Sequence, residues 1–285
     1  MGEIFNLILV NPIINILVAL YQFLFFLHIP YALGFSIILL TVLIRFLLYP
    51  LTTTQLKSSK KMQDLAPHLS KIKEKHKGDA KRLQQETMRL YKEHGVNPAA
   101  GCLPVLIQIP MIWALYSVLI KIVALKPEVV VSQVNNVAYL DILKLTHPWD
   151  QYFFGIPLGQ NPSQLITVIG PLVFLVPLAT GLFQFIQSKM MFAKPAEKPS
   201  FATSDAKAME VKKASEGKGG DFASAFQTQS LYIFPVMIGF FSYTFPIGLS
   251  LYWNTFTIFG ILQQYRVSGA GGLSGWKEKI LSKKS

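Results

Sequence analysis

The sequence predicts an all-α polytopic membrane protein, and three observations lead to this fold class. Of the 285 residues, 51% are hydrophobic and 15% are charged, whereas a typical soluble domain carries about 25% charged residues. The apolar residues gather into runs close to the length of a membrane-spanning helix, about 20 residues. The basic residues, which give the chain a net charge of +12, gather between these runs. This composition argues against a soluble globular enzyme and against a disordered tail protein.

Five apolar runs are candidates for membrane spans. They cover residues 33–55, 103–124, 165–187, 229–245 and 247–265. The first three have the length that a spanning helix needs. The last two are shorter and are separated only by Pro246, which predicts a tight helical hairpin.

The basic residues predict the orientation of these spans. Of the 27 Lys and Arg residues, eleven lie in 56–95, seven in 188–228 and five in 266–285. Only three lie between residues 121 and 164. Because basic loops stay on the cytoplasmic side, the three basic segments are expected inside and residues 125–164 outside. Five spans satisfy this alternation when the N-terminus is outside and the C-terminus is cytoplasmic.

The N-terminal segment, residues 1–32, leaves two alternatives open. Residues 4–28 are apolar enough for a sixth span, which would place the N-terminus inside. However, Asn11 followed by Pro12 is a good helix start. A narrow polar stripe then recurs at helical spacing at Asn15, Ala19 and Gln22. A helix over 12–27 would be about 24 Å long, shorter than the roughly 30 Å of a bilayer core. We therefore favour an amphipathic helix at the outer interface.

The two long cytoplasmic segments differ in character. Residues 56–95 predict an antiparallel helical hairpin, with a turn at Gly78, Asp79 as an N-cap and Gly95 ending the second helix. The apolar stripe of this hairpin is thin, which predicts a mobile element. Residues 188–228 are rich in Lys, Ala, Ser, Gly and Pro and have no apolar period, which predicts a flexible loop.

Arg45 is the residue most indicative of function. It lies near the middle of the run 33–55, where a charge costs several kcal/mol. No Asp or Glu lies in any of the predicted spans, so an ion pair inside the membrane is excluded. We therefore expect Arg45 to face water, polar side chains or a visiting anionic group.

Polar side chains on the predicted spans are candidates for lining one hydrated groove that opens toward the cytoplasm. The candidates are Thr41, Gln108, Thr180, Gln184, Gln187, Ser250, Trp253, Asn254, Thr257 and Gln264. The alternative is ordinary hydrogen bonding between helices, worth about 1 kcal/mol per bond. For a single hydroxyl this alternative is the better one, but several stripes beside one unpaired Arg favour the groove.

Signatures of enzymes and metal sites are missing from the sequence. Cys102 is the only cysteine, and the five His residues are scattered without ligand spacing. There is no GxSxG or HExxH motif and no phosphate-binding loop. We expect no catalytic residues, no metal and no cofactor. The basic tail, 266–285, is compatible with binding to ribosomal RNA or anionic lipid, and equally with setting the topology.

Four blocks of sequence resemble the YidC family of membrane protein insertases, which includes mitochondrial and thylakoid relatives. In chain order they are IILLTVLIRFLLYPLTTTQLKSSKKMQDLAPHL (37–69), QQETMRLYKEHGVNP (84–98), NPAAGCLPVLIQIPMIWALYSVL (97–119) and FPIGLSLYWNTFTIFGILQQ (245–264). The similarity covers roughly residues 12–192 and 226–266.

The resemblance implies a five-transmembrane-helix insertase core with an interfacial outer helix and a cytoplasmic helical hairpin. In the family, an Arg of the first core helix lies in a hydrophilic groove that is open to cytoplasm and lipid and closed outward. Arg45 matches this position, and Gln184 and Trp253 match groove-lining positions. The hairpin is expected to capture substrate through its basic residues Lys71, Lys73, Lys75, Lys77, Lys81 and Arg82.

The resemblance also implies partners and a location. The expected substrates are nascent membrane proteins with short, often acidic, translocated segments, and the protein is expected in a bacterial plasma (inner) membrane. It would work as a monomer in the lipid bilayer, alone or beside the Sec translocon, with the ribosome as a further partner and without DNA. Two alternatives stay open: a chaperone for helices already inserted, and an anion transporter.

Overall fold

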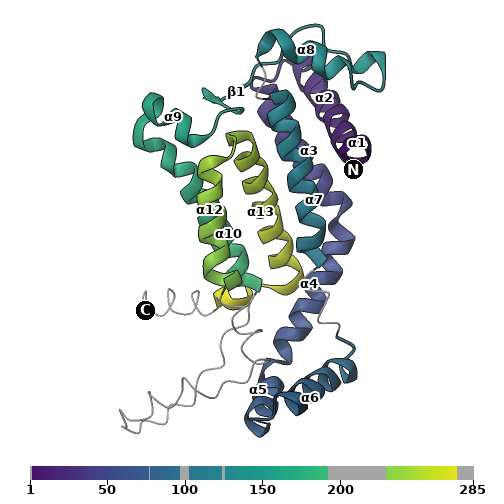
Figure 1. Ribbon diagram of the computed structural model, residues 1–285, viewed down its shortest axis with the longest axis vertical. Coiled ribbons are helices and arrows are strands. Elements are labelled where there is room, and N and C mark those ends of the chain that lie inside the picture. The colour runs from purple at the N-terminus through teal and green to yellow at the C-terminus, as the bar shows by residue number, and fades with distance from the viewer. Residues whose placement is uncertain (1, 77, 97–102, 124–125, 192–228, 275–285) are drawn as a thin grey trace. The chain divides into compact units, whose positions relative to one another are not determined.

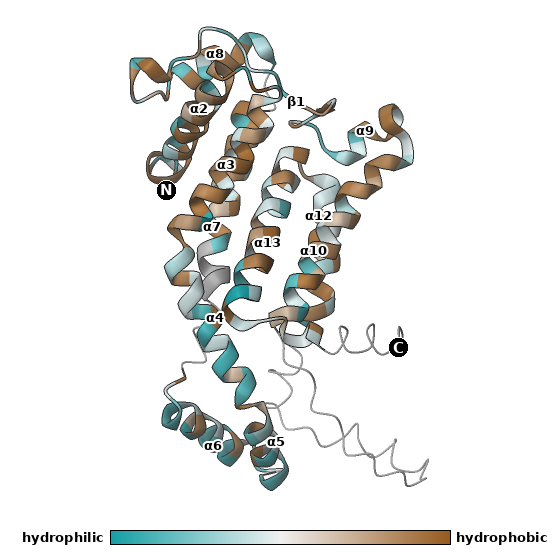
Figure 2. Ribbon diagram, turned by 180° about the vertical axis from the view of Figure 1, so that it is seen from behind, coloured by the Kyte–Doolittle hydropathy of each residue, from teal (hydrophilic) through white to brown (hydrophobic). Residues whose placement is uncertain are grey.

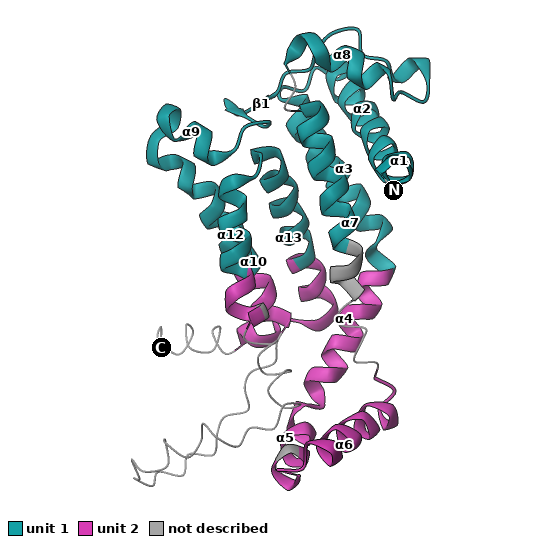
Figure 3. Ribbon diagram, in the orientation of Figure 1, with its two compact units in different colours: residues 1–50, 104–184, 235–260 teal, residues 51–103, 185–234, 261–285 magenta. Residues whose placement is uncertain are grey.

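The computed structural model describes residues 2–76, 78–96, 103–123, 126–191 and 229–274 (Figure 1). Most of these residues are helical, in agreement with the predicted fold class. The chain divides into two compact units, which Figure 3 colours separately. Unit 1 consists of residues 1–50, 104–184 and 235–260. Unit 2 consists of residues 51–103, 185–234 and 261–285.

The N-terminal helix is longer than the stretch expected from the sequence. It is built from α1 (Gly2–Phe5), the π-helical turn η1 (Asn6–Val10) and α2 (Asn11–Phe26). Together they form one apolar helix of 25 residues, which at 1.5 Å per residue is about 37 Å long. The helix therefore extends well before Asn11, and a shortage of length no longer argues against a span. Its place at the interface stays a prediction.

The polar stripe of α2 binds the loop between residues 136 and 145. The Asn15 side-chain amide donates to the Val137 carbonyl at 2.8 Å, and the Tyr139 backbone N–H donates to Asn15 Oδ1 at 2.8 Å. Gln22 Nε2 donates to the Lys144 carbonyl at 3.1 Å. These side chains satisfy backbone groups of a loop more than 100 residues away, so they hold that loop against α2.

The predicted run 33–55 is divided into two helices. Helix α3 spans Ala32–Leu47 and α4 spans Tyr49–Asp64, with a break at Leu48. The cause is Pro50, which has no N–H to donate to the carbonyl four residues earlier. Arg45 therefore lies in the last turn of α3 rather than in the middle of one continuous helix.

Helices, short strands and turns follow in the central part of unit 1 (Figure 1). A helical segment formed by α7 (Leu103–Val118) and η3 (Leu119–Val123) leads to α8 (Pro127–Asn135) and the turn η4 (Asp141–Leu143). Strands β1 (Tyr152–Phe153) and β2 (Ile156–Pro157) pair antiparallel, with Phe153 opposite Ile156. Then come α9 (Pro162–Ile169), the 3-10 turn η5 (Gly170–Phe174) and α10 (Leu175–Met191).

The last helices form an antiparallel pair around Pro246. The π-turn η7 (Gln229–Ile233) precedes α12 (Phe234–Thr244), and α13 (Ile247–Ser268) is followed by the turn η8 (Gly271–Leu273). Helix α12 also crosses α10 closely, because a Cβ on Gly239 would lie 3.1 Å from the Pro177 carbonyl oxygen. Figure 2 shows that the helices of unit 1 are predominantly hydrophobic.

Unit 2 contains most of α4, which continues to Asp64, and the two helices that follow it in the segment 56–95. Helix α5 spans Ala66–Lys75 and α6 spans Ala80–Glu93. Asp79 is the N-cap of α6, as predicted, and accepts from the Arg82 backbone N–H at 3.0 Å. The core of the pair is small and centres on Leu65, Leu90 and Val96, and the outer faces are strongly hydrophilic (Figure 2).

Hydropathy and length identify candidate membrane spans within the described residues. The helices Gly2–Phe26 and Pro162–Met191 are each long and apolar enough to cross a membrane, and α3 with α4 is a third candidate when counted as one broken span. The stretches Gln108–Val123 and Leu231–Thr244 are shorter apolar helices. The count of five spans stays a prediction, and the predicted flexible loop falls mostly on residues 192–228, outside the described ranges.

Candidate functional site around Arg45

The guanidinium of Arg45 is buried against one residue of α13. Only 4% of the Arg45 surface is exposed. Its Cζ atom lies 3.4 Å from the ring centre of Phe256 and 5.9 Å from that of Phe259. Nη2 of Arg45 donates to the backbone carbonyl of Phe256. A single residue thus offers the cation both an aromatic face and a carbonyl oxygen.

Arg45 keeps a capacity for binding that these contacts do not use. Its Nε is buried and has no hydrogen-bond partner within the described ranges, where Arg45 also makes no ion pair. A desolvated cation–π contact contributes about 2 kcal/mol, which is less than the several kcal/mol that burial of a charge in a membrane costs. The guanidinium presents donors in a planar fork that matches a carboxylate or a carbonyl. An additional acceptor would therefore stabilise this site.

A chain of contacts links α3, α13 and α7. The side-chain amide of Gln108 donates to the Tyr252 hydroxyl at 3.1 Å. Tyr252 is fully buried, and its ring lies 5.7 Å from that of Phe256, centre to centre. Arg45 rests on the Phe256 ring. Gln108 and Arg45, which lie 63 positions apart in sequence, are thereby connected through one face of α13.

A second link connects α10 with α13. The indole Nε1 of Trp253 donates to Gln184 Oε1 at 3.1 Å. This is the ordinary interhelical hydrogen bond that the sequence left open as the alternative to a groove. Asn254, the next residue of α13, behaves differently: its Oδ1 is buried and has no partner among the described residues.

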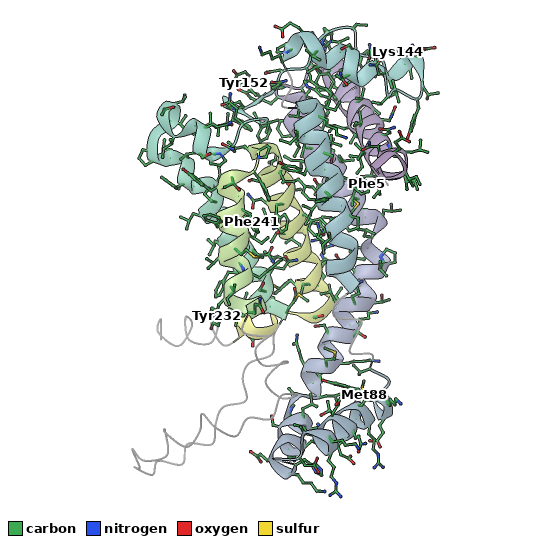
Figure 4. All side chains as sticks on the ribbon, viewed as in Figure 1. Phe5, Met88, Lys144, Tyr152, Tyr232 and Phe241 are labelled. Atoms are coloured by element: carbon green, nitrogen blue, oxygen red, sulfur yellow. The ribbon has the colours of Figure 1, made fainter. Side chains whose placement is uncertain are left out.

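The hydroxyl groups of the site bond both within their own helices and across neighbouring helices. Thr41 is buried and donates to the carbonyl of Ile37 in its own helix at 2.6 Å. Thr180 lies 3.2 Å from the Ser242 hydroxyl, which lies 2.8 Å from the Ser250 hydroxyl. A hollow of about 10 Å³ adjoins these three groups and is also lined by Trp253 and Phe241. Figure 4 labels Phe241. The hollow has room for about one water molecule.

Most of the residues expected to line a groove lie in unit 1. They are Thr41, Arg45, Gln108, Thr180, Gln184, Ser250, Trp253, Asn254 and Thr257. Gln187 and Gln264 lie in unit 2 instead. There Gln264 is buried, and the neighbouring Gln263 donates to the hydroxyls of Thr52 at 2.7 Å and Thr53 at 3.1 Å. Whether the unit 1 residues form one hydrated groove stays a prediction.

The sequence interpretation missed the aromatic residues that surround Arg45. Tyr252, Phe256 and Phe259 lie at positions i, i+4 and i+7 of α13, so they share one helical face. This spacing is visible in the sequence. A polar-partner criterion for a buried cation does not select it, because the face of an aromatic ring attracts a cation without being a polar side chain.

The basic residues proposed for substrate capture lie on the helices of unit 2. Lys71, Lys75, Lys81 and Arg82 have exposed side chains, and Lys73 also belongs to α5. Lys77 lies outside the described residues. Arg82 Nε lies 3.5 Å from Asp79 Oδ2 in an exposed ion pair, which contributes at most about 1 kcal/mol.

Comparisons with known proteins identify the family. A family model described as 60Kd inner membrane protein matches residues 24–270. Membrane protein insertase YidC of Fusobacterium nucleatum is 32% identical over 238 residues, which cover 84% of this chain and 87% of that protein. Membrane protein insertase MisCA of Bacillus subtilis is 33% identical over 241 residues, which cover 83% and 70%.

A chloroplast protein is also among the relatives. ALBINO3-like protein 1, chloroplastic, of Arabidopsis thaliana is 31% identical, and the match covers 89% of this chain and 46% of that protein. A solved structure, described as an active YidC insertase with the first transmembrane domain resolved, matches with a TM-score of 0.46 and 26% identity. That match covers 87% of this chain and 45% of the other.

The chain belongs to the 60Kd inner membrane protein family of YidC-type insertases. The first two relatives are named for membrane protein insertion, which is not an enzymatic activity. This agrees with the expectation, drawn from the missing catalytic motifs, that the chain is not an enzyme.

Proposed function

We propose that this protein is a membrane protein insertase of a bacterial plasma membrane. It moves hydrophilic segments of nascent membrane proteins through a hydrated groove that contains Arg45 and opens to the cytoplasm. The adjoining apolar segment partitions into lipid meanwhile. The relatives named as insertases support the activity. The observation that carries the mechanism is the buried Arg45, whose Nε has no partner within the described residues.

The Arg45 guanidinium lowers the barrier for an acidic segment. Its present acceptor is the neutral carbonyl of Phe256. Hydrogen bonds from a guanidinium to a carboxylate are roughly twice as strong as bonds between neutral groups, so an entering carboxylate competes well for the donors. The attraction is also stronger in a low-dielectric site than in water. The protein thereby replaces part of the hydration that the segment loses.

The polar side chains of α10 and α13 extend this role to uncharged groups. Asn254 Oδ1 is a buried acceptor without a donor among the described residues, and a backbone N–H of the substrate would satisfy it. When the hydrogen bond between Gln184 and Trp253 breaks, the Gln184 oxygen becomes free to accept and the Trp253 N–H becomes free to donate to the same substrate segment. A mixed set of donors and acceptors suits a polypeptide, which presents both.

Capture precedes entry and takes place at the cytoplasmic hairpin. The exposed Lys71, Lys75, Lys81 and Arg82 attract acidic segments and anionic surfaces. In the proposed topology, the N-terminus is outside and the C-terminus is cytoplasmic. The ribosome and the Sec translocon are proposed partners in delivery. The membrane potential then favours outward movement of an acidic residue by about 2.3 kcal/mol per charge per 100 mV.

An insertion assay with reconstituted protein tests the role of Arg45. The substrates are two single-span proteins that differ only in an acidic or an amide-containing translocated tail. We expect Arg45→Ala to slow insertion of the acidic tail at least tenfold, and of the amide tail much less. Arg45→Lys retains the charge and should recover part of the rate. Thr255→Val is the matched control, because the Thr255 hydroxyl donates to the Leu251 carbonyl of its own helix and Thr255 is not among the residues expected to line the groove. Equal rates for Arg45→Ala and wild type with the acidic tail would refute the electrostatic mechanism.

Two other functions give different results in reconstituted vesicles. A chaperone for inserted helices would crosslink from positions 184 and 253 to completed substrates and not to arriving chains. An anion transporter would carry solute flux without any substrate protein. Site-specific crosslinking to a stalled nascent chain separates the insertase from the chaperone, and an anion-flux assay separates it from the transporter.

A further inference from the structure

The charged residues are distributed unevenly along the stretch that runs from the start of α8 to α10. All charged residues of the stretch 126–162 lie in its first part, at Lys126, Glu128, Asp141, Lys144 and Asp150. From Gln151 to Ser188 there is no Asp, Glu, Lys or Arg. This uncharged stretch contains the β1–β2 hairpin, α9, η5 and most of α10.

Helix α9 is surplus to a membrane crossing. The helical stretch Pro162–Met191 has 30 residues, about 45 Å at 1.5 Å per residue, against a hydrocarbon core of about 30 Å. A break at Gly170, where φ is +60°, and at Pro171, which carries no N–H, separates α9 from α10. Figure 1 shows that α9 turns aside from the line of the helix that follows it. The 17 residues of α10 span about 26 Å, and the five 3-10 residues of η5 add about 10 Å at 2.0 Å per residue, so the two together exceed the thickness of the core without α9.

The uncharged stretch exposes large apolar side chains. Val168 is 75% exposed, Leu172 and Phe154 are 66% exposed, and Tyr152 is 52% exposed. The opposite side of α9 is packed, since Leu165 is only 3% exposed. Helix α9 therefore has one apolar face that is buried in the core of unit 1 and a second apolar face that is exposed. Figure 2 shows the hydrophobic colouring along β1 and much of α9.

The tip of the hairpin packs against the residue that precedes α3, and both residues have a left-handed backbone conformation. Phe154 and Tyr31 both have positive φ, +50° and +56°, and their ring centres lie 4.8 Å apart. Such backbone angles cost about 1–3 kcal/mol each in a non-Gly residue. Phe153 is wedged against α3 at Gly34, where an added Cβ would lie 2.0 Å from the ring. The adjoining Phe154 ring nevertheless stays mostly exposed.

We propose that α9 and the β1–β2 hairpin form a ledge that lies in the headgroup and upper acyl region of the adjacent leaflet, which the predicted topology makes the outer one. The occupant of its exposed apolar side is phospholipid. Three observations favour lipid over a protein partner. The ledge has no ionic group, and it continues directly into the apolar surface of α10, where Leu175 and Leu178 are exposed. Aromatic rings at such a boundary are also typical of membrane interfaces. The charged residues around α8 and η4 face water. This inference does not depend on insertase activity.

Spin-label depth measurements test the proposal on the full chain in vesicles of phosphatidylcholine and phosphatidylglycerol. Single cysteines are placed on a Cys102→Ser background at Phe154 and Val168 in the ledge, and at Ser132 and Lys144 in the charged part. Figure 4 labels Tyr152 and Lys144, one in each part. Labels at 154 and 168 should be accessible to oxygen and shielded from a water-soluble nickel complex, at a depth of about 5–10 Å. Labels at 132 and 144 should show the opposite.

Two outcomes would overturn the proposal. Nickel accessibility at 154 and 168 equal to that at 132 and 144 would place the ledge in water. Labels shielded from both reagents would indicate cover by a second copy or by another protein. Because Phe154→Cys removes the ring contact with Tyr31, quenching of a fluorophore at position 172 by brominated lipid provides a second measurement. Circular dichroism and gel filtration verify the fold of each variant.

Discussion

The guanidinium carbon of Arg45 lies 3.4 Å from the ring centre of Phe256, and the same residue accepts a hydrogen bond from Arg45 through its backbone carbonyl. The backbone carbonyl remains when the side chain at position 256 is changed, whereas the aromatic face is lost when that side chain is no longer aromatic. The two contributions can therefore be separated by mutation. Phe259, whose ring is 5.9 Å from the same carbon, provides a neighbour of similar size with a weaker contact.

Phe256→Leu should destabilise the protein more than Phe259→Leu. Both variants lose a ring, but only the first removes the close face for a desolvated cation, worth about 2 kcal/mol. Thermal unfolding in one detergent, followed by circular dichroism, measures both. In an Arg45→Ala background the difference between the two variants should disappear. If it persists there, the ring acts through packing alone.

Trp253 and Gln184 should show a positive coupling energy. Trp253→Phe removes the donor and Gln184→Leu removes the acceptor, so each single variant leaves one polar group without its partner. Interhelical bonds of this kind average about 0.6 kcal/mol and reach about 1.7 kcal/mol in membrane proteins. A double-mutant cycle on the free energy of unfolding measures the value. Additive effects would mean that the bond does not form in the bilayer.

Gly34→Ala should displace the β1–β2 hairpin. The new methyl group would lie 2.0 Å from Cδ2 of Phe153, and such overpacking costs about 1–3 kcal/mol. Gly34→Ala combined with Phe153→Leu should recover much of the loss, because leucine has a smaller side chain that repacks more easily. Gly2→Ala is the matched control, since nothing lies within 4 Å of the corresponding position. Limited proteolysis of the hairpin reports the displacement.

Asp79→Ala should loosen the first turn of α6. The carboxylate accepts the Arg82 backbone N–H at 3.0 Å, and loss of an N-cap costs about 0.5–2 kcal/mol. Asp79→Asn can still accept this bond and should behave almost like wild type. Amide hydrogen exchange of residues 80–84 provides the measurement. Unchanged protection in Asp79→Ala would show that packing alone holds the helix start.

Asn15→Ala should release the loop that follows α8. This side chain donates to the Val137 carbonyl and accepts from the Tyr139 N–H, both at 2.8 Å. Without it, two backbone groups of the loop lose their partners, which costs about 1–3 kcal/mol each where they stay buried. Faster hydrogen exchange at 137–140 is the expected result, and Asn11→Ala, which keeps both contacts, is the control. Equal exchange in both variants would contradict the proposed attachment.

The sequence predicted the helical class and the family, because hydropathy and long motifs are properties of the chain itself. It did not predict where helices break. Pro50 and the Gly170–Pro171 pair lie inside apolar runs, and a hydropathy window averages over them, although each removes or redirects backbone hydrogen bonds. The runs 33–55 and 165–187 were therefore each treated as one continuous helix, whereas the structure divides them at Leu48 and at Gly170.

The candidate site was also only partly accessible from sequence. Arg45 could be singled out because no acidic residue lies in the apolar runs. Its position over Phe256 depends on how α3 and α13 are rotated against each other, which no local pattern encodes. The same holds for Tyr252, whose hydroxyl binds Gln108 from a helix 144 residues away. The packing of the helices decides which residues become partners. The sequence therefore indicates that a residue such as Arg45 needs a partner, and it does not indicate which residue of another helix provides one.

The positive charge of Arg45 has a consequence for the ion permeability of the membrane. A protein that opens a watery path for polypeptides risks a leak of protons and sodium ions. An arginine side chain stays protonated at every physiological pH, and a fixed cation in a narrow pathway raises the electrostatic barrier to other cations. In the proposed mechanism, the residue that attracts acidic segments would thus also protect the ion gradients on which the cell depends, because both effects come from the same buried charge.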